Sequence, residues 1–313
     1  MSNAVPQPWE VYFGGNFWGH GDKAPCDTEI KIGKTFQYAG HTWFFPSVYL
    51  CGEGLVADLC MATGNEPFSA FMEKWNLSFD ENQCKDHTDE EDEMRLRAEH
   101  PLYFPCRLRL SLGGAPLPFD HGCQTIIFSD VWENAPKGDA ERSIAAHYAL
   151  NSALNWTAYR FVFRWTGKRP DRLEALTAAI APGSVSLPGP HFSVRQRDES
   201  ISFVHPFTGA QHVLTAEDFQ WEKIPLSEQE DTPALYAAVM RCRIDPPLPK
   251  DTVEVLDCTH SSGVGICYAL PAEDGKKDLF TAFSAPRTAR GDAVTWRLVL
   301  HGTKWKNEWF SFL

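Results

Sequence analysis

The sequence predicts a mainly β protein with two antiparallel β-sandwich or barrel-like domains and a few short helices. Residues 104–112 and 159–165 alternate between large apolar and polar side chains, as strands do when one face lies on the core and the other in water. Arg107 and Arg109 fall on the polar face of the first strand, and Arg160 and Arg164 on that of the second. Elsewhere, short apolar runs alternate with turns, without the strand–helix–strand rhythm of a parallel sheet.

The first elements are typical of a β-meander. An apolar run at residues 9–13 and a glycine- and aromatic-rich loop at 14–22 precede strands at residues 29–32, 35–39, 42–45, 48–51 and 55–61. We expect two-residue hairpin turns at Gly33 with Lys34 and at Gly40 with His41, because glycine takes positive φ without strain.

Helices are predicted at residues 65–75 and 139–154, with Asn65 and Asp139 as their N-caps. The first helix places four large apolar side chains on one face: Phe68, Phe71, Met72 and Trp75. Residues 80–99 are strongly acidic, and Thr88 with Glu91 fits a capping box. This segment is interpreted as a solvated face or insertion, with an acidic docking patch for a basic partner as the alternative. Residues 172–180 fit either a helix or a strand.

The clearest domain boundary is residues 181–190, where Pro, Gly and Ser disfavour regular structure. It separates an N-terminal domain, residues 1–182, from a C-terminal β-sandwich-like domain, residues 191–313. The second domain is predicted to contain eight short strands, at residues 191–196, 200–205, 211–214, 235–244, 252–256, 265–270, 293–300 and 309–313.

Charge and cysteine content restrict the partners and the compartment. The formal net charge is −12 over 313 residues, which disfavours nucleic acid and anionic membrane surfaces as partners. The nine cysteines form no CxxC pair, and the sequence shows neither a signal peptide nor a membrane-spanning run. We therefore expect a cytoplasmic protein with free thiols that binds no cofactor.

Several strings are distinctive: WEVYFGGNFWG at 9–19, FMEKWNLS at 71–78, HGC at 121–123, PGPHF at 188–192 and HPFTGAQHVLT at 205–215. Together they resemble an uncharacterised family of bacterial proteins and span most of the chain. The resemblance implies no activity and assigns no functional residue.

The loop at residues 14–22 has the composition of a ligand-binding site. Trp18 and Phe17 can stack on a sugar or a base, while Asn16, His20 and Asp22 can hydrogen-bond its edges. The alternative interpretation is a folded loop whose aromatic side chains close the end of a sheet.

Two Cys–His pairs are weaker candidates for catalysis. In an extended segment His121 and Cys123 share a face, so that the imidazole can polarise the thiol. Asp120 neighbours His121 in sequence but points to the opposite face of a strand. Cys258 with His260 repeats the pairing.

Metal binding is not expected. The set His121, Cys123, Cys258 and His260 would suit Zn²⁺ only if the fold brought the two pairs together. Cys84 with His87 lacks a second pair nearby. His205 and His212 bracket a probable hairpin turn; they could face each other and hold a metal or relay a proton, but we interpret both as structural.

The leading hypothesis is a non-enzymatic protein that binds a small molecule, a carbohydrate or a protein. The alternative is a hydrolase or transferase that uses a Cys–His pair, with Cys123 and His121 as the first choice.

Overall fold

The structure is a computed structural model that describes residues 9–19, 24–80, 89–170, 172–224, 234–259 and 279–312. The mainly β prediction is confirmed, since antiparallel sheets dominate the described residues and helices are few and short. The sheets do not close into a barrel within the described ranges, so the sandwich alternative holds. The chain forms two compact units, unit 1 with residues 1–86, 99–183 and 305–313, and unit 2 with residues 87–98 and 184–304.

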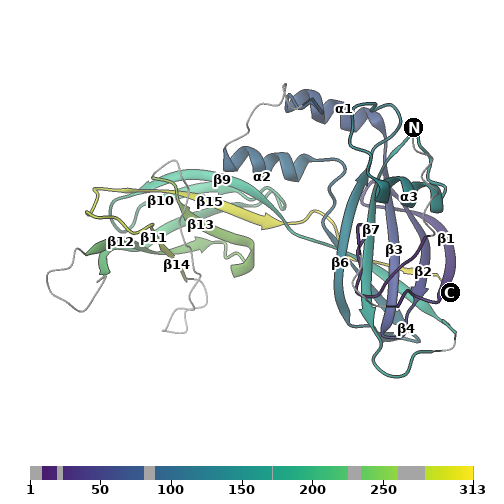
Figure 1. The fold of residues 1–313 in the computed structure, drawn as a ribbon. Coiled ribbons are helices and arrows are strands. Elements are labelled where there is room, and N and C mark those ends of the chain that lie inside the picture. The colour runs from purple at the N-terminus through teal and green to yellow at the C-terminus, as the bar shows by residue number, and fades with distance from the viewer. Residues whose placement is uncertain are drawn as a thin grey trace. The chain divides into compact units, whose positions relative to one another are not determined.

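Unit 1 contains a five-stranded sheet in the order β1-β2-β3-β7-β6 (Figure 1). Its strands are β1 (Thr28–Tyr38), β2 (His41–Leu50), β3 (Gly54–Thr63), β6 (Phe119–Ile127) and β7 (Asn155–Arg164). A four-stranded sheet in the order β16-β8-β4-β5 joins β4 (Cys106–Leu112), β5 (Ala115–Pro116), β8 (Leu176–Pro182) and β16 (Glu308–Ser311). The ambiguous segment at 172–180 therefore ends in a strand.

The main core of unit 1 combines side chains from both of these sheets. Trp43, Leu59 and Phe163 contribute from the five-stranded sheet, and Leu110 and Ile180 from the other. The alternation predicted for residues 104–112 is confirmed, because β4 buries Leu108 and Leu110 and exposes its arginines.

The predicted alternation of residues 159–165 is wrong at Arg160. All ten residues of β3 and nine of the ten in β7 are buried, including Arg160. The reason is that both faces of these central strands are covered: one by the main core, the other by residues 9–17 and by helix α3 (Asp139–His147) with the segment after it.

One of the two predicted hairpin turns is present, one residue earlier than predicted. Ala39 and Gly40 have φ of 55° and 80° and join β1 to β2, with Tyr38 opposite His41. Gly33, with φ of 61°, lies instead at an irregularity inside the continuous strand β1, between Lys31 and Lys34. A glycine that allows positive φ therefore marks a bulge here, not a turn.

Both predicted helices are present, but the second ends at His147 and not at residue 154, and the predicted caps of both are wrong. Helix α1 (Asn65–Lys74) and helix α3 begin after Gly64 and Gly138, and neither has a side-chain cap. The Asn65 side-chain oxygen Oδ1 instead accepts hydrogen bonds from the side chains of Ser129, Trp132 and Asn155. The Asn65 side chain thus connects α1 to these neighbouring segments. Of the four apolar residues predicted on the first helix, Phe68 and Phe71 are buried.

Unit 2 also contains two sheets. One runs β10-β11-β12-β14, with β10 (Ser200–Val204), β11 (Gln211–Ile224), β12 (Leu235–Asp245) and β14 (Leu279–Phe283). The other runs β13-β15-β9, with β13 (Val253–Asp257), β15 (Val294–Gly302) and β9 (Val185–Val194), and a short 3₁₀ turn, η1 (Lys250–Thr252), precedes β13. Both sheets contribute to one core that includes Leu214, Met240, Val255, Trp296 and Leu298. Of the predicted strands, residues 265–270 lie outside the described residues.

The acidic segment contributes helix α2 (Glu90–Glu99), which buries no residue of its own. Glu90 and Glu91 form ion pairs with the buried Arg297 of β15, and Glu91 also pairs with His191 of β9. Thr88, the first residue of the proposed capping box, lies outside the described residues. The charge of α2 therefore serves to attach it to unit 2.

The proline- and glycine-rich segment at 181–190 is not a linker. It completes β8 and forms most of β9, which among the described strands is an edge strand that pairs only with β15. Proline is tolerated at an edge, because its missing N–H does not interrupt a ladder on the open side. The boundary between unit 1 and unit 2 lies between residues 183 and 184, inside this segment. Residues 305–313, assigned from sequence to the C-terminal domain, lie in unit 1 because β16 pairs with β8.

Cys26 and Cys51 form a disulfide, with their Cα atoms 4.2 Å apart. The expectation of free thiols is therefore wrong for this pair, whereas Cys60, Cys106, Cys123 and Cys258 form no disulfide among the described residues. The N-terminal segment explains the pairing: Tyr12 bridges to Pro25 and the Cys26 N–H donates to Val11, which brings Cys26 to the end of β2. In the described part of the chain, no helix has the length and apolar character needed to cross a membrane.

Candidate ligand-binding site

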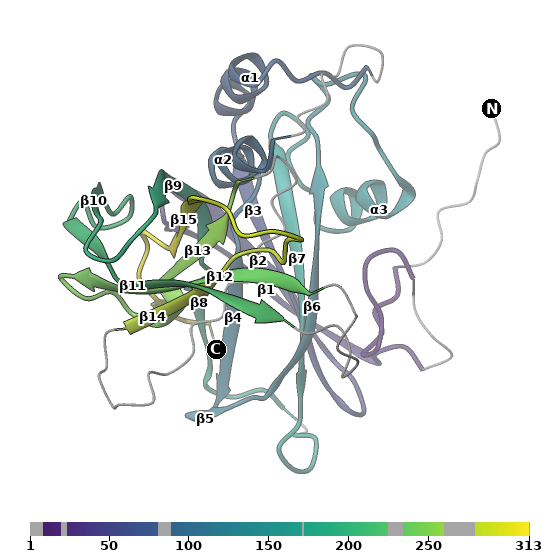
Figure 2. The same cartoon turned by 90° about the vertical axis from the view of Figure 1, so that its left-hand side faces the viewer.

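A cleft of about 810 Å³ lies in unit 1 between residues 9–19 and helix α3. Figure 2 shows α3 beside the sheet that carries β6 and β7. Three of the five residues predicted to bind a ligand line this cleft: Asn16, Phe17 and Trp18. His20 and Asp22 lie outside the described residues. The two walls are more than a hundred residues apart in sequence, so only the fold brings them together.

The loop that carries Trp18 is held by Asn16. The Asn16 side-chain oxygen accepts hydrogen bonds from the backbone N–H groups of Trp18 and Gly19, both at 2.8 Å. Such a side-chain turn stabilises a loop locally. The Asn16 side-chain oxygen is thus used to hold the loop that carries Trp18, and the predicted hydrogen bond from Asn16 to a ligand stays a prediction.

Phe17 and Trp18 have different roles. The ring of Phe17 packs against the Arg160 guanidinium, whose Cζ lies 4.5 Å from the ring centre. Phe17 therefore packs inward, as expected for a folded loop whose aromatic side chains close the end of a sheet. Trp18 is 57% exposed, and its indole N–H donates to Glu141 of α3 at 3.3 Å. The one large aromatic face that remains open to a ligand at this loop is therefore that of Trp18.

The floor of the cleft is a buried ion pair. Arg160 and Asp58, 2% and 1% exposed, form two hydrogen bonds, from Nε to Oδ1 at 2.8 Å and from Nη2 to Oδ2 at 2.7 Å. Burial alone would lower the pKa of Arg160, but the Asp58 carboxylate outweighs this effect and the pKa is raised. Arg160 stays charged, with its plane between Phe17 and Trp9.

A chain of hydrogen bonds continues from this ion pair to the cleft wall. The Tyr148 hydroxyl donates to Asp58 at 2.6 Å and lies 2.7 Å from the Tyr49 hydroxyl, which accepts from the indole N–H of Trp9 at 2.9 Å. Burial raises the pKa of both tyrosines, so both remain neutral hydroxyl groups. His147 of α3 completes the wall and stacks on Trp9, with ring centres 4.6 Å apart.

Carboxylates dominate the rim of the cleft. Glu10 accepts from the Tyr12 hydroxyl at 2.6 Å, Asp139 pairs with Arg142 at 2.5 Å, and Glu141 accepts from Thr125 at 2.6 Å. The cation at the floor, Arg160, is neutralised by Asp58. The lining is therefore acidic and rich in hydrogen-bond acceptors, which favours neutral or cationic ligands over anions.

Sequence reasoning missed Asp58, Arg160, Trp9 and His147. A signal existed for the ion pair, because Asp58 is the single charge of the apolar run at residues 55–61 and Arg160 interrupts the aromatic run at residues 159–165. A charge in such a run is stable when a partner neutralises it. No signal in the sequence indicated that Trp9 and His147 would meet.

His121 and Cys123 support the loop at 14–19. His121 Nε2 lies 3.4 Å from the Gly15 carbonyl oxygen, and the Phe17 backbone hydrogen-bonds the Cys123 sulfur. An irregularity of β6 between Phe119 and His121 brings Asp120 to 3.5 Å from His121 Nδ1, contrary to the prediction of opposite faces. Both side chains thus contact the loop that carries Trp18.

The thiol of Cys123 is not activated. Its pKa is raised, chiefly because burial disfavours the thiolate. We therefore expect iodoacetamide to modify Cys123 of the native protein more slowly than free cysteine at neutral pH, since only the thiolate reacts. Peptide mapping after timed alkylation measures this rate. Modification of Cys123 faster than free cysteine would instead indicate a reactive nucleophile.

The second Cys–His pair is less informative. Cys258 lies in unit 2, where burial also raises its pKa, and His260 lies outside the described residues. Cys84 and His87 lie outside them as well. Within the described ranges, no group of three or more His, Cys, Asp and Glu side chains is arranged to hold a metal ion.

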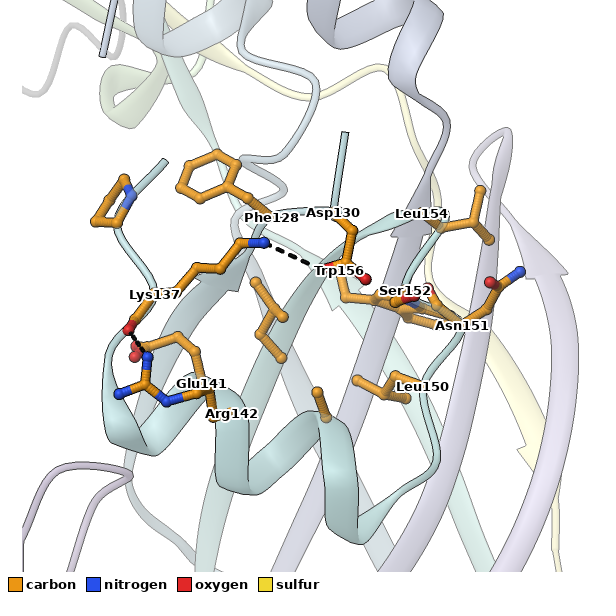
Figure 3. A pocket seen from close by; sticks show the side chains of 13 residues that line it. Phe128, Asp130, Lys137, Glu141, Arg142, Leu150, Asn151, Ser152, Leu154 and Trp156 are labelled. Carbon is orange, nitrogen blue, oxygen red and sulfur yellow. Dashed lines mark hydrogen bonds and ion pairs between the residues drawn. The ribbon is translucent and has the colours of Figure 1, made fainter. Parts of the chain in front are cut away.

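A second, smaller hollow of about 100 Å³ lies against the other side of α3, between α3 and Trp156 (Figure 3). Its two cations already have partners: Lys137 pairs with Asp130 at 3.0 Å, and Arg142 donates to the Lys137 carbonyl. Its small volume makes it a poorer ligand site than the cleft.

The comparisons with known proteins found no matching family model, no matching curated protein and no matching solved structure.

Proposed function

We propose that the protein is a non-enzymatic binding protein and that a neutral carbohydrate occupies the cleft between residues 9–19 and α3. The observation that carries this proposal is the open indole face of Trp18 at the rim of a cleft of about 810 Å³. Small-molecule sites commonly have about 300–1,000 Å³ and combine aromatic surface with a few polar groups. Glu10, Asp139 and Glu141 supply acceptors for sugar hydroxyls, and their charge disfavours anionic ligands, nucleic acid included.

Trp18→Ala tests the proposal. We expect wild-type protein to bind at least one member of a panel of neutral mono- and oligosaccharides, and Trp18→Ala to bind it about tenfold or more weakly. Titration calorimetry measures both affinities. Trp309→Ala is the matched control, because Trp309 is 59% exposed on β16 of the same unit and does not line the cleft.

Two results would contradict the proposal. The first is a complete absence of binding across the panel. The second is equal affinity of Trp18→Ala and Trp309→Ala for a sugar that does bind, which would move the ligand away from Trp18.

A hydrolase or transferase that uses Cys123 and His121 remains the alternative, with less support. Burial raises the pKa of the Cys123 thiol, and both side chains are engaged by the loop that carries Trp18.

The cytoplasm remains our proposal for the compartment, and the free thiols described in both units are consistent with it. The Cys26–Cys51 disulfide is instead evidence for an oxidising compartment. Trapping of thiols in intact cells shows whether Cys26 and Cys51 are reduced, as in the cytoplasm, or oxidised.

A further inference from the structure

Two buried histidines lie together on the β10–β11 hairpin of unit 2. His205 follows β10 and His212 is the second residue of β11, opposite Phe203. The hairpin is closed by hydrogen bonds from the His205 N–H to Ala210 and from the Gly209 N–H to His205, each at 2.8 Å. Both histidines are only 4% exposed, and their ring centres are 6.0 Å apart.

One nitrogen of each ring has a partner. His212 Nδ1 lies 2.7 Å from the Pro246 carbonyl oxygen. A carbonyl only accepts, so Nδ1 carries the hydrogen and the lone pair of the neutral ring is on Nε2. His205 Nδ1 lies 3.2 Å from the Thr208 hydroxyl, which also accepts from the Ala210 N–H.

The other nitrogen of each ring has no partner among the described residues. Nε2 of His205 and Nε2 of His212 are both buried, and neither forms a hydrogen bond within the described ranges. Buried polar atoms in native proteins are nearly always paired, and two such atoms on neighbouring side chains point to a shared ligand.

We propose that His205 and His212 bind one metal ion through their Nε2 atoms, and that monovalent copper is the ion that fits best. Imidazole is a good ligand for copper. Two imidazoles that share an ion at a metal–nitrogen distance of about 2 Å have ring centres roughly 5–6 Å apart. The hydrogen bond from His212 Nδ1 to a backbone carbonyl is the outer contact that usually orients a metal-binding histidine.

The surroundings favour an ion of low charge. The ring and hydrogen-bond contacts of the two histidines are with aromatic or uncharged groups: Phe203 stacks on His212 at 5.5 Å, Phe207 lies 5.7 Å from His205, and the hydrogen-bond contacts are with Thr208 and the Pro246 carbonyl. Since no carboxylate or thiolate is among these contacts to balance a second charge, burial of a divalent ion would cost more.

The first experiment locates the ion. Crystals of the full chain are soaked in silver nitrate, because Ag⁺ is a redox-stable substitute for monovalent copper and is visible by anomalous scattering. We expect an anomalous peak within about 2–2.5 Å of both Nε2 atoms. A peak at other sites alone, or a water molecule bridging the two Nε2 atoms, would overturn the proposal.

The second experiment uses solution protein whose accessible thiols have been alkylated, so that cysteines do not compete for copper. One equivalent of monovalent copper should shift the Nε2 resonances of His205 and His212 in ¹⁵N-resolved histidine spectra, and His205→Gln and His212→Gln should lose this response. His121→Gln of unit 1 should keep it. Thr208→Val, which removes only the hydroxyl next to His205, should bind about tenfold more weakly.

Unchanged Nε2 resonances of wild-type protein would refute the site even if the histidine variants failed to fold.

Discussion

Replacing Asp58 by alanine is expected to lower the free energy of unfolding by about 3–5 kcal/mol, because the buried Arg160 then loses its counter-charge. The same loss is expected for Arg160→Met, which leaves the Asp58 carboxylate unpaired at 1% exposure. Urea unfolding combined with hydrogen exchange of the β3 and β7 amides measures the effect in unit 1.

The double variant Asp58→Leu with Arg160→Met is the control that separates charge from volume. Well-packed apolar replacements of both partners often leave stability unchanged or raise it. We therefore expect the double variant to be more stable than either single variant. Additive losses would show that the two side chains contribute to stability independently of each other, which would contradict our explanation.

Trp43→Ala is expected to destabilise unit 1 by a similar amount, about 3–5 kcal/mol, through loss of buried contacts and creation of a cavity. Trp43 is 0% exposed, lies 5.4 Å from Phe104 and 5.7 Å from Tyr159 between ring centres, and donates its indole N–H to the Tyr38 carbonyl at 3.1 Å. The midpoint of urea unfolding, followed by the same exchange measurement, checks the prediction.

Trp309→Ala serves as the control for Trp43, because an exposed substitution usually changes stability by less than about 0.5 kcal/mol. A loss for Trp43→Ala no larger than that of Trp309→Ala would contradict the packing that we describe for the main core of unit 1.

Part of the candidate cleft could be predicted from sequence. Glycines and aromatic residues concentrated at positions 14–22 indicated a loop with stacking surface, and Trp18 is the exposed ring of that loop. The opposite wall could not be predicted, because Glu141 and His147 reach the loop only through the packing of α3 on β6. The Cys26–Cys51 disulfide could not be predicted for the same reason, because a spacing of 25 residues does not by itself indicate that two cysteines are in contact.

The sequence by itself determined the antiparallel strands that have one wet face, such as β4, and the turn at Gly40. In both cases a local rule suffices: period-2 alternation follows from a half-covered sheet, and positive φ favours glycine. Only the tertiary structure decided which strands are covered on both faces. That covering places Arg160 inside. Other long-range pairings make the proline-rich segment the edge strand β9 beside β15 and bring β16 back to β8. These outcomes depend on contacts between residues far apart in sequence, and the apolar–polar pattern within one strand does not indicate such contacts.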